Sequence, residues 1–216
     1  MYYPLLIVLV MIFMGAYFYP QLPARVPSHW DASGEVNGYS SRAVAVVSLP
    51  LIALLLYGFF LLIPRIEVFR KNVESFYRTS GPGFVSVFML FFLILYVATL
   101  LAGVGYQFSM NYVILPLLAL LFGYIGIVLP TVKRNFFIGI RTPWTLASER
   151  VWKKTHEMGG KVFIGMAVLM LVAMLLPAHA FWIMMILALF AVVWTFVYSY
   201  LEFRKEKRKG EGIDGL

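Results

Sequence analysis

The side chains of this sequence that could do chemistry are concentrated in its longest polar stretch, residues 134–161, RNFFIGIRTPWTLASERVWKKTHEMGGK. His156 lies near two carboxylates, Glu149 and Glu157, and a histidine beside a carboxylate can act in general acid–base catalysis. His156-Glu157 also begins like the zinc motif HExxH, but residue 160 is glycine, so the second histidine ligand of that motif is missing. The stretch therefore offers acid–base groups but no zinc site of this type.

Other catalytic and metal-binding arrangements are also missing. The chain has no cysteine, which excludes disulfides, thiol catalysis and cysteine metal sites. No serine has the nearby base and acid of a serine hydrolase, and Gly159-Gly160 is not followed by the GK[ST] of a phosphate-binding loop. His29 and Asp31 could supply two metal ligands, but a zinc site usually has three or more protein ligands. We therefore expect no catalytic residue, no metal and no cofactor.

The composition is that of a membrane protein. Apolar residues make up 62% of the chain and charged residues only 13%, whereas soluble domains have about 45–50% and about 25%. The formal net charge of +8 could suggest nucleic-acid binding. The basic residues, however, lie in clusters between hydrophobic stretches, which favours a membrane protein that makes no direct contact with nucleic acid.

Six stretches are apolar and long enough to cross the hydrocarbon core, which needs about 20 residues of helix. None has a charged residue or a histidine in its interior. Because lipid cannot hydrogen-bond to the backbone, we expect helices, the first of them a retained span rather than a cleaved leader. The predicted fold class is all-α, a polytopic six-transmembrane-helix bundle. Its spans are residues 2–19, 43–64, 83–105, 112–132, 162–177 and 180–201.

The basic residues also predict the orientation of the bundle. If the amino terminus is cytoplasmic, all of the 18 lysines and arginines except Arg25 and Arg42 fall on the cytoplasmic side. Cytoplasmic loops of membrane proteins carry such an excess of positive charge. We therefore expect both termini in the cytoplasm.

The loop of residues 20–42 is the only sizeable extracytoplasmic segment in this topology. Its prolines favour an extended start, and Gly34 and Asn37-Gly38 are turn signals. Trp30 and Tyr39 could anchor the loop at the membrane surface. Either this anchored turn is its whole role, or the loop binds an external ligand through His29, Trp30, Asp31, Gly34 and Tyr39.

Three polar segments are expected on the cytoplasmic side. Residues 65–82 have apolar residues at helical spacing, which predicts a short amphipathic helix at the headgroup layer. Within the motif, Thr142-Pro143 is expected to stop one element, and Thr145 or Ser148 to cap a helix over 146–158 that ends at Gly159-Gly160. In that helix Trp152 and His156 lie on the same face, at positions i and i+4. If this face is buried, His156 is expected to form a hydrogen bond with a backbone carbonyl. The basic tail, residues 202–216, is expected to attract anionic lipid.

Proline and glycine inside the spans predict features of the packing. Pro50 and Pro116 could kink their helices and leave carbonyls that neighbouring helices must satisfy. Gly123 and Gly126, with Gly103 and Gly105, could allow close helix contacts.

Two segments of the chain resemble the SdpI family of bacterial and archaeal membrane proteins. The family signature is similar to a set of residues between 135 and 160, namely Asn135, Gly139, Arg141, Thr142, Pro143, Trp144, Thr145, Leu146, Trp152, Thr155, His156 and Gly160. The small domain at the front of this family, DUF1648, is similar to the outer loop at Pro23, Val26, Pro27, His29, Trp30, Asp31, Gly34, Asn37, Tyr39, Ser41 and Arg42. Both segments occur in the family's order.

The resemblance implies six spans and a role in immunity. It also implies two regions. The first is a helical hairpin, residues 1–64, with the DUF1648-like loop 20–42. The second is a four-helix region, residues 65–216, with the motif loop 133–161.

A family member of this kind protects cells against a secreted peptide toxin, and is thought to relay toxin binding by drawing a cytoplasmic transcriptional repressor to the membrane. The partners expected are therefore the lipid bilayer, a toxin outside and a repressor inside. On this hypothesis the outer loop binds the toxin. The cytoplasmic surface that responds to toxin binding and contacts the repressor consists of Asn135, Arg141, Thr142, Pro143, Trp144, Trp152 and His156.

Two alternatives from other classes stay open. A small transporter or channel would need polar groups along its path, and the spans offer only weak candidates such as Ser48, Ser86, Thr99 and Thr131. A membrane enzyme would use His156 with Glu149 or Glu157 at the inner interface. We favour the non-enzymatic immunity and sensing protein.

Overall fold

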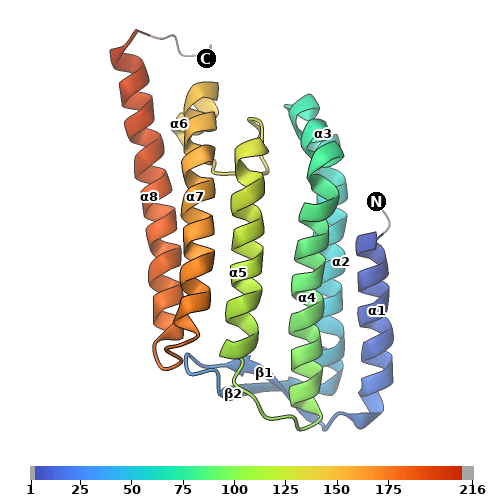
Figure 1. Ribbon diagram of the computed structural model, residues 1–216. Coiled ribbons are helices and arrows are strands. Elements are labelled where there is room, and N and C mark those ends of the chain that lie inside the picture. Colours follow the sequence, from blue (N-terminus) through green and yellow to red (C-terminus); the bar gives the residue numbers. More distant parts are fainter. Residues whose placement is uncertain (1–2, 211–216) are drawn as a thin grey trace.

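The computed structural model describes residues 3–210 and contains six long helices that alternate in direction (Figure 1). Each is long and apolar enough to cross a membrane, which confirms the predicted six-helix bundle. The helices are α1 (Tyr3–Phe18), α2 (Arg42–Ile66), α4 (Gly81–Gly103), α5 (Asn111–Val128), α7 (Glu149–Ala173) and α8 (Ala180–Arg208). The remaining elements are short: α3 (Arg70–Thr79), α6 (Pro143–Ala147), the 3-10 turns η1 (Tyr19–Gln21) and η2 (Leu129–Thr131), and strands β1 (Arg25–Trp30) and β2 (Val36–Ser41).

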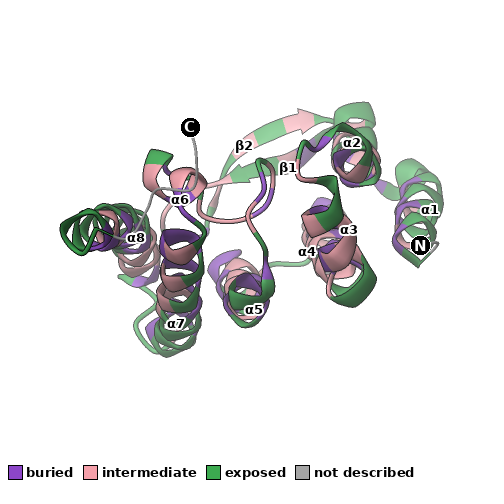
Figure 2. Cartoon of the chain, turned by 90° about the horizontal axis from the view of Figure 1, so that it is seen from above, coloured by how far each residue is buried: buried purple, intermediate pink, exposed green. Residues whose placement is uncertain are grey.

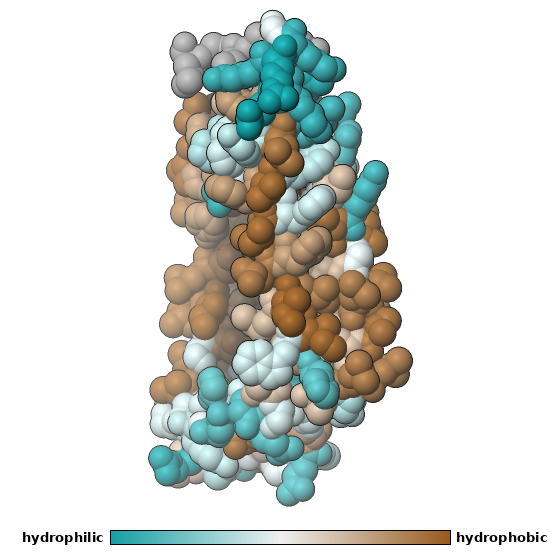
Figure 3. All heavy atoms as spheres, turned by 90° about the vertical axis from the view of Figure 1, so that its left-hand side faces the viewer, coloured by the Kyte–Doolittle hydropathy of each residue, from teal (hydrophilic) through white to brown (hydrophobic). Residues whose placement is uncertain are grey.

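Polar and apolar residues are separated along the bundle. Figure 3 shows a band of apolar side chains between two hydrophilic ends. Large apolar side chains in this band are exposed on the outside of the helices; on α8, for example, Leu189 and Val192 are each 66% exposed. Such a continuous apolar surface is stable in lipid rather than in water. The end with the two strands is called the hairpin end below, and the opposite end, with α3 and α6, the motif end.

The helices pack in two groups. The larger hydrophobic core joins α1, α2, α3 and α4, with Met11, Tyr57, Phe76, Met89 and Leu100 among its buried side chains. The second core lies between α5, α7 and α8, and consists of Ala119, Met166, Ala167, Met170 and Ala191. Seen from above, α8, α7, α5 and α4 follow one another across the bundle, with α2 and α1 beyond them (Figure 2).

α7 continues through Gly159-Gly160, and the prediction of a separate helix over 146–158 that breaks there is wrong. The reason is tertiary packing. A Cβ on Gly160 would lie 2.7 Å from the carbonyl oxygen of Gly126 in α5, and a Cβ on Gly126 would lie 2.8 Å from the carbonyl oxygen of Gly160. These glycines let α5 and α7 approach closely, which the local preference of glycine for helix ends cannot reveal.

Two prolines inside α2 free backbone carbonyls, and tyrosines from other helices satisfy them. Pro50 has no N–H for the carbonyl of Val46, and the Tyr96 hydroxyl of α4 donates to that carbonyl at 3.0 Å. In the same way Pro64 frees the carbonyl of Phe60, to which the Tyr77 hydroxyl of α3 donates at 2.7 Å. For Pro50, the prediction that a neighbouring helix satisfies the carbonyl is confirmed.

At the hairpin end, β1 and β2 form an antiparallel pair that the sequence analysis did not predict. The turn lies at residues 31–35, with Gly34 at φ +83°, as its turn signal indicates. Asn37-Gly38 lies within β2, so that second turn prediction is wrong: pairing with β1 around His29 extends the backbone there.

At the motif end, α3 is the predicted amphipathic helix, with Val73 and Phe76 buried. Thr142-Pro143 begins α6 rather than stopping an element. The Thr142 hydroxyl accepts a hydrogen bond from the Thr145 N–H, and Pro143 occupies the first helical turn, where its missing N–H costs nothing. Ser148 caps α7, as predicted. The tail is helical as far as Arg208, and residues 211–216 lie outside the described residues.

Candidate functional site

Asn135 organises the first part of the motif. Its side chain is buried and uses both ends of the amide: Nδ2 donates to the carbonyls of Lys133 and Ile138, and Oδ1 accepts from the N–H groups of Phe137 and Ile138, at 2.6–2.9 Å. One side chain therefore folds residues 133–138 into a compact loop. A buried amide with four partners has no capacity left for a ligand.

His156 is fully buried, and both of its ring nitrogens are hydrogen-bonded to backbone. The N–H of Ile140 donates to Nε2 at 3.1 Å, which requires an unprotonated Nε2, so Nδ1 carries the proton that it donates to the carbonyl of Trp152 at 2.8 Å. The predicted bond to a backbone carbonyl is confirmed. The imidazole is thus neutral and joins the motif loop to α7.

Trp152 and Gly139 complete this arrangement. The indole stacks on the His156 ring with centroids 4.0 Å apart, and its Nε1 donates to the carbonyl of Val132 at 2.7 Å. Gly139 has φ +117° and lies against both rings: a Cβ there would lie 3.2 Å from Trp152 Cζ2 and closer still to His156. Only glycine fits this position, because the backbone angle and the available space both exclude a side chain.

A hydroxyl group and an aromatic side chain attach α6 to α8. The Thr142 hydroxyl donates to Ser199 Oγ of α8 at 3.0 Å. Within the motif loop, the Thr145 hydroxyl donates to the carbonyl of Ile140 at 2.9 Å. Trp144 packs edge-on against Phe196, with centroids 4.9 Å apart, and against Tyr200. The short helix is thereby fixed on the last span.

The residues from the motif that were predicted to form one surface come together, but most of them face inward. Asn135, Thr142, Trp152 and His156 are buried, and Trp144 is half-buried. Arg141 and Pro143 are exposed, and the Arg141 guanidinium donates to the carbonyl of Phe136. We call the five residues Asn135, Gly139, Thr142, Trp152 and His156 the motif cluster. Its contacts make it an internal link between helices.

Three carboxylates at this end were missed by the sequence analysis. Glu67 is 5% exposed and accepts from the N–H groups of Phe69 and Phe136, each at 2.9 Å, so it ties the α2–α3 connection to the motif loop. On α8, Glu202 pairs with Lys154 at 3.1 Å and with Lys205 at 2.7 Å, and Glu206 accepts from the Ser148 hydroxyl. Acidic residues at the ends of spans look solvated in a sequence, and no pattern distinguishes the buried ones.

The geometry gives no support to acid–base chemistry at His156. Both nitrogens are occupied by backbone partners, whereas Glu149 and Glu157 are exposed on the surface of α7. Glu149 lies instead 3.8 Å from the Arg134 guanidinium. Among the described residues, no three histidines or carboxylates are grouped in a way that could hold a metal ion.

At the hairpin end, the turn of residues 31–35 is held against the start of α5. The Asp31 carboxylate accepts from the hydroxyl and N–H of Ser33 and from the N–H of Glu35, and these bonds, the Ser33 hydroxyl foremost, lower the pKa of Asp31. The carbonyl of Gly34 accepts from the N–H of Met110 at 3.0 Å, and the Asn111 amide donates to the carbonyl of Ala32 at 3.1 Å. Asp31 and Gly34 therefore position the turn.

A cleft of about 640 Å³ lies between this hairpin and the α4–α5 connection, and is called the hairpin cleft below. Trp30 and Tyr39 line it, as do Glu35, Tyr106 and Phe108. Tyr39 and Tyr106 are 56% and 65% exposed. Of the predicted outer residues, Trp30 and Tyr39 thus line the cleft, while His29 is exposed, does not line it and pairs with Asn37 at 2.5 Å. Tyr106 and Phe108 were missed, since they belong to a connection with no motif of its own.

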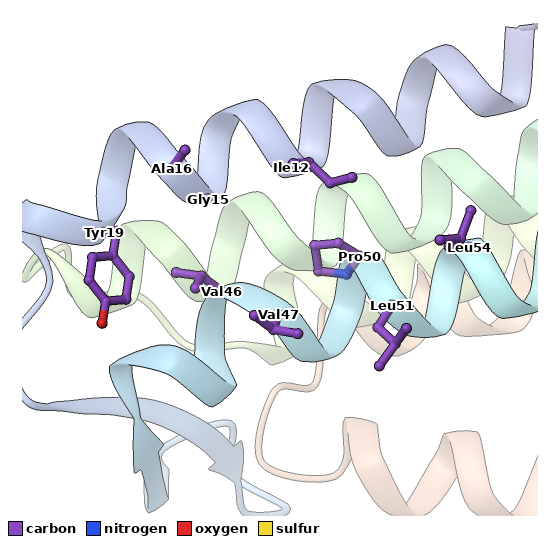
Figure 4. Close-up of a pocket in the computed structure, with 9 residues that line it drawn as sticks. All are labelled: Ile12, Gly15, Ala16, Tyr19, Val46, Val47, Pro50, Leu51 and Leu54. Carbon is purple, nitrogen blue, oxygen red and sulfur yellow. The ribbon is translucent and has the colours of Figure 1, made fainter.

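A second hollow, of about 360 Å³, lies between α1 and α2 within the apolar band (Figure 4). Its walls are apolar apart from the Tyr19 hydroxyl, and they include Gly15, Ala16 and Pro50. A surface of this kind can be covered by lipid chains, and it offers no groups for catalysis.

Six apolar helices with polar residues collected at both ends define a multi-pass protein of the cell membrane. The family model described as "SdpI/YfhL protein family" matches residues 131–199, and that of a domain of unknown function, DUF1648, matches residues 6–54. The chain is 24% identical to "Immunity protein SdpI" of Bacillus subtilis (strain 168) over 202 residues, which are 93% of this chain and 94% of that protein. The predicted resemblance to the SdpI family is confirmed. No solved structure matches the chain.

Proposed function

We propose that this protein is a non-enzymatic immunity protein that protects the cell against a secreted peptide toxin by binding it in the hairpin cleft. The similarity to an immunity protein along nearly the whole chain supports the general role. The location rests on the cleft itself, where two aromatic residues of the DUF1648-like loop, Trp30 and Tyr39, meet two aromatic residues of the α4–α5 connection, Tyr106 and Phe108.

The lining of the cleft suits a peptide. Aromatic side chains provide contact area at a low cost in conformational entropy, and together with the Glu35 carboxylate they can hold a cationic or aromatic side chain. Trp30 is half-buried in the wall of the cleft, whereas Tyr39 and Tyr106 are exposed and accessible to a ligand. On this proposal Asp31 and Gly34 act indirectly, through the position of the turn.

A relay to a cytoplasmic repressor is the second part of the proposal. Of the predicted inner residues, Arg141 and Pro143 are exposed at the motif end and can contact a partner. The motif cluster beneath them would then transmit movements of α5, α7 and α8 to that surface. Such coupling requires two arrangements of these helices with different affinities for toxin.

The transport alternative receives little support from the spans. The buried hydroxyls of Thr99 and Thr195 donate to carbonyls of their own helices, Leu95 and Ala191, at 2.9 and 2.7 Å. The six apolar stretches hold no charged residue, whereas spans that move ions usually hold inward-facing charges.

Protection of sensitive cells tests the proposed function. Cells that express the wild-type chain should survive a secreted peptide toxin to which cells with an empty vector succumb. The double variant Tyr39→Ala/Tyr106→Ala should raise toxin sensitivity at least about tenfold, because loss of two central aromatic contacts typically costs more than 1 kcal/mol each.

A matched control separates this effect from damage to the fold. Tyr17→Ala/Tyr112→Ala removes two tyrosines that are 62% and 55% exposed and lie outside the cleft, so protection should be unchanged. Equal loss in both double variants, at equal membrane expression, would contradict the cleft as the binding site. Survival of wild-type cells no better than with the empty vector, across a panel of secreted peptide toxins, would contradict immunity itself.

A further inference from the structure

A second polar cleft, of about 730 Å³, lies at the motif end and has no part in the proposed function. It is bounded by Asn72 of α3 on one side, by η2 and the following residues on another, and by the first turns of α7. Its lining also includes Pro130, Val132 and Trp152. We call it the basic cleft.

The lining of the basic cleft carries an excess of positive charge. Lys133, Arg134, Arg150 and Lys153 line it together with a single carboxylate, Glu149. Within residues 3–210, Lys133 and Lys153 form no ion pair, and both are exposed. Glu149 is 67% exposed and 3.8 Å from Arg134, a distance and exposure at which an ion pair contributes little. Lys133 and Lys153 therefore give the cleft an excess of positive charge that suits an anion.

Arg134 is held in place before any ligand binds. Its Nη1 donates to the carbonyl of Leu146 at 3.2 Å, its guanidinium lies 5.3 Å from the centre of the Phe69 ring, and its backbone carbonyl accepts from the Asn72 amide at 2.8 Å. Its buried Nε forms no hydrogen bond with the described residues. A guanidinium fixed in this way loses little conformational entropy when it binds a phosphate oxygen.

The position of the cleft identifies the source of the anion. The cleft is lined by η2, which directly follows α5, and by Asn72 of the amphipathic helix α3. Because these elements lie where the chain leaves the apolar spans, we place the cleft at the level of the lipid headgroups. Pro130 and Val132 place apolar surface next to the basic side chains, as a molecule with both a phosphate and an acyl chain requires. Basic pockets between spans on the cytoplasmic side are suited to anionic lipid headgroups.

We propose that the basic cleft binds the phosphate of an anionic phospholipid, with Arg134 as the fixed contact and Lys133 and Lys153 as the mobile ones. A bound headgroup there would connect α3 with η2 and α7, next to the hydrogen bonds by which Glu67 and Asn72 tie the α2–α3 connection and α3 to the motif loop. This site is separate from the hairpin cleft, and it does not depend on toxin binding.

Lipid titration of the purified full-length protein in neutral detergent tests this proposal. Short-chain phosphatidylglycerol should bind the wild type more tightly than short-chain phosphatidylcholine does. Lys133→Ala/Lys153→Ala should weaken phosphatidylglycerol binding about tenfold or more, since each lysine near an anionic headgroup adds a substantial attraction. Both lysines are exposed and free of ion pairs, so the thermal unfolding temperature without lipid should stay at the wild-type value.

Arg78→Ala/Lys161→Ala is the matched control, because it removes the same charge from exposed positions that lie outside both the cleft and the basic tail. It should change phosphatidylglycerol binding less than twofold. Equal weakening in the two double variants would overturn the site in favour of general attraction between charges. Binding of inorganic phosphate as tight as that of phosphatidylglycerol, or no preference over phosphatidylcholine, would overturn the lipid as the occupant.

Discussion

Gly139→Ala is expected to destabilise the protein by about 3 kcal/mol or more. An alanine at φ +117° is strained, and its Cβ would collide with the stacked rings of Trp152 and His156. Either the rings move, which breaks the hydrogen bonds of His156 to Ile140 and Trp152, or the loop detaches from α7. Denaturant or thermal unfolding of the purified protein in detergent measures the loss.

Gly165→Ala is the control for this variant. Gly165 also belongs to the motif-bearing part of the chain, but it lies inside α7, and a Cβ there meets no atom within 4 Å. Alanine should be neutral or stabilise the helix by up to about 1 kcal/mol. Comparable losses at positions 139 and 165 would contradict the role given to the motif cluster.

Tyr96→Phe is expected to cost about 1–2 kcal/mol, because it leaves the carbonyl of Val46 without a donor inside the apolar band. The origin of that cost can be isolated, since the carbonyl is free only because of Pro50. With Pro50→Ala, residue 50 regains an N–H that can bond to Val46 within the helix. The cost of Tyr96→Phe should therefore be clearly smaller in the Pro50→Ala background.

The double-mutant cycle supplies its own control. The coupling free energy between Tyr96→Phe and Pro50→Ala should be about 1 kcal/mol. Its sign should be such that the double variant is more stable than the sum of the two single effects predicts. A cost for Tyr96→Phe that is the same in both backgrounds would show that the hydroxyl does not act through the carbonyl freed by Pro50. Tyr77→Phe, which removes the donor to Phe60 at the end of α2, offers the same comparison with Pro64→Ala.

The spans could be predicted because lipid imposes two strong conditions, a length of about 20 apolar residues and a closed set of backbone hydrogen bonds. The same reasoning anticipated that a neighbour must satisfy the carbonyl freed by Pro50, although not that Tyr96 would do so. Where local preference and packing compete, the sequence was misleading. Gly159-Gly160 looks like the end of a helix, yet its contact with Gly126 keeps α7 continuous.

At the candidate sites, residue types were predictable and their orientation was not. The prediction that Trp152 and His156 lie on the same face of a helix is confirmed by their stacked rings. A sequence does not tell, however, whether that face contacts a partner or the protein interior. Of the residues that line the hairpin cleft, Trp30 and Tyr39 are among the predicted ligand contacts, whereas Tyr106 and Phe108 reach it through tertiary contacts between connections that are far apart in the chain. The outer strands were missed because both are short and β1 contains a proline.

Labelling of single cysteines in intact cells tests the central claim, that the hairpin cleft faces the outside and the motif end faces the cytoplasm. The chain contains no cysteine, so Ala24→Cys at the hairpin end and Lys133→Cys at the motif end, both at exposed positions, can each be followed alone. A membrane-impermeant maleimide should label residue 24 in intact cells and residue 133 only after permeabilisation. Labelling of residue 133 but not residue 24 in intact cells would contradict the account, because a secreted toxin could then not reach the hairpin cleft.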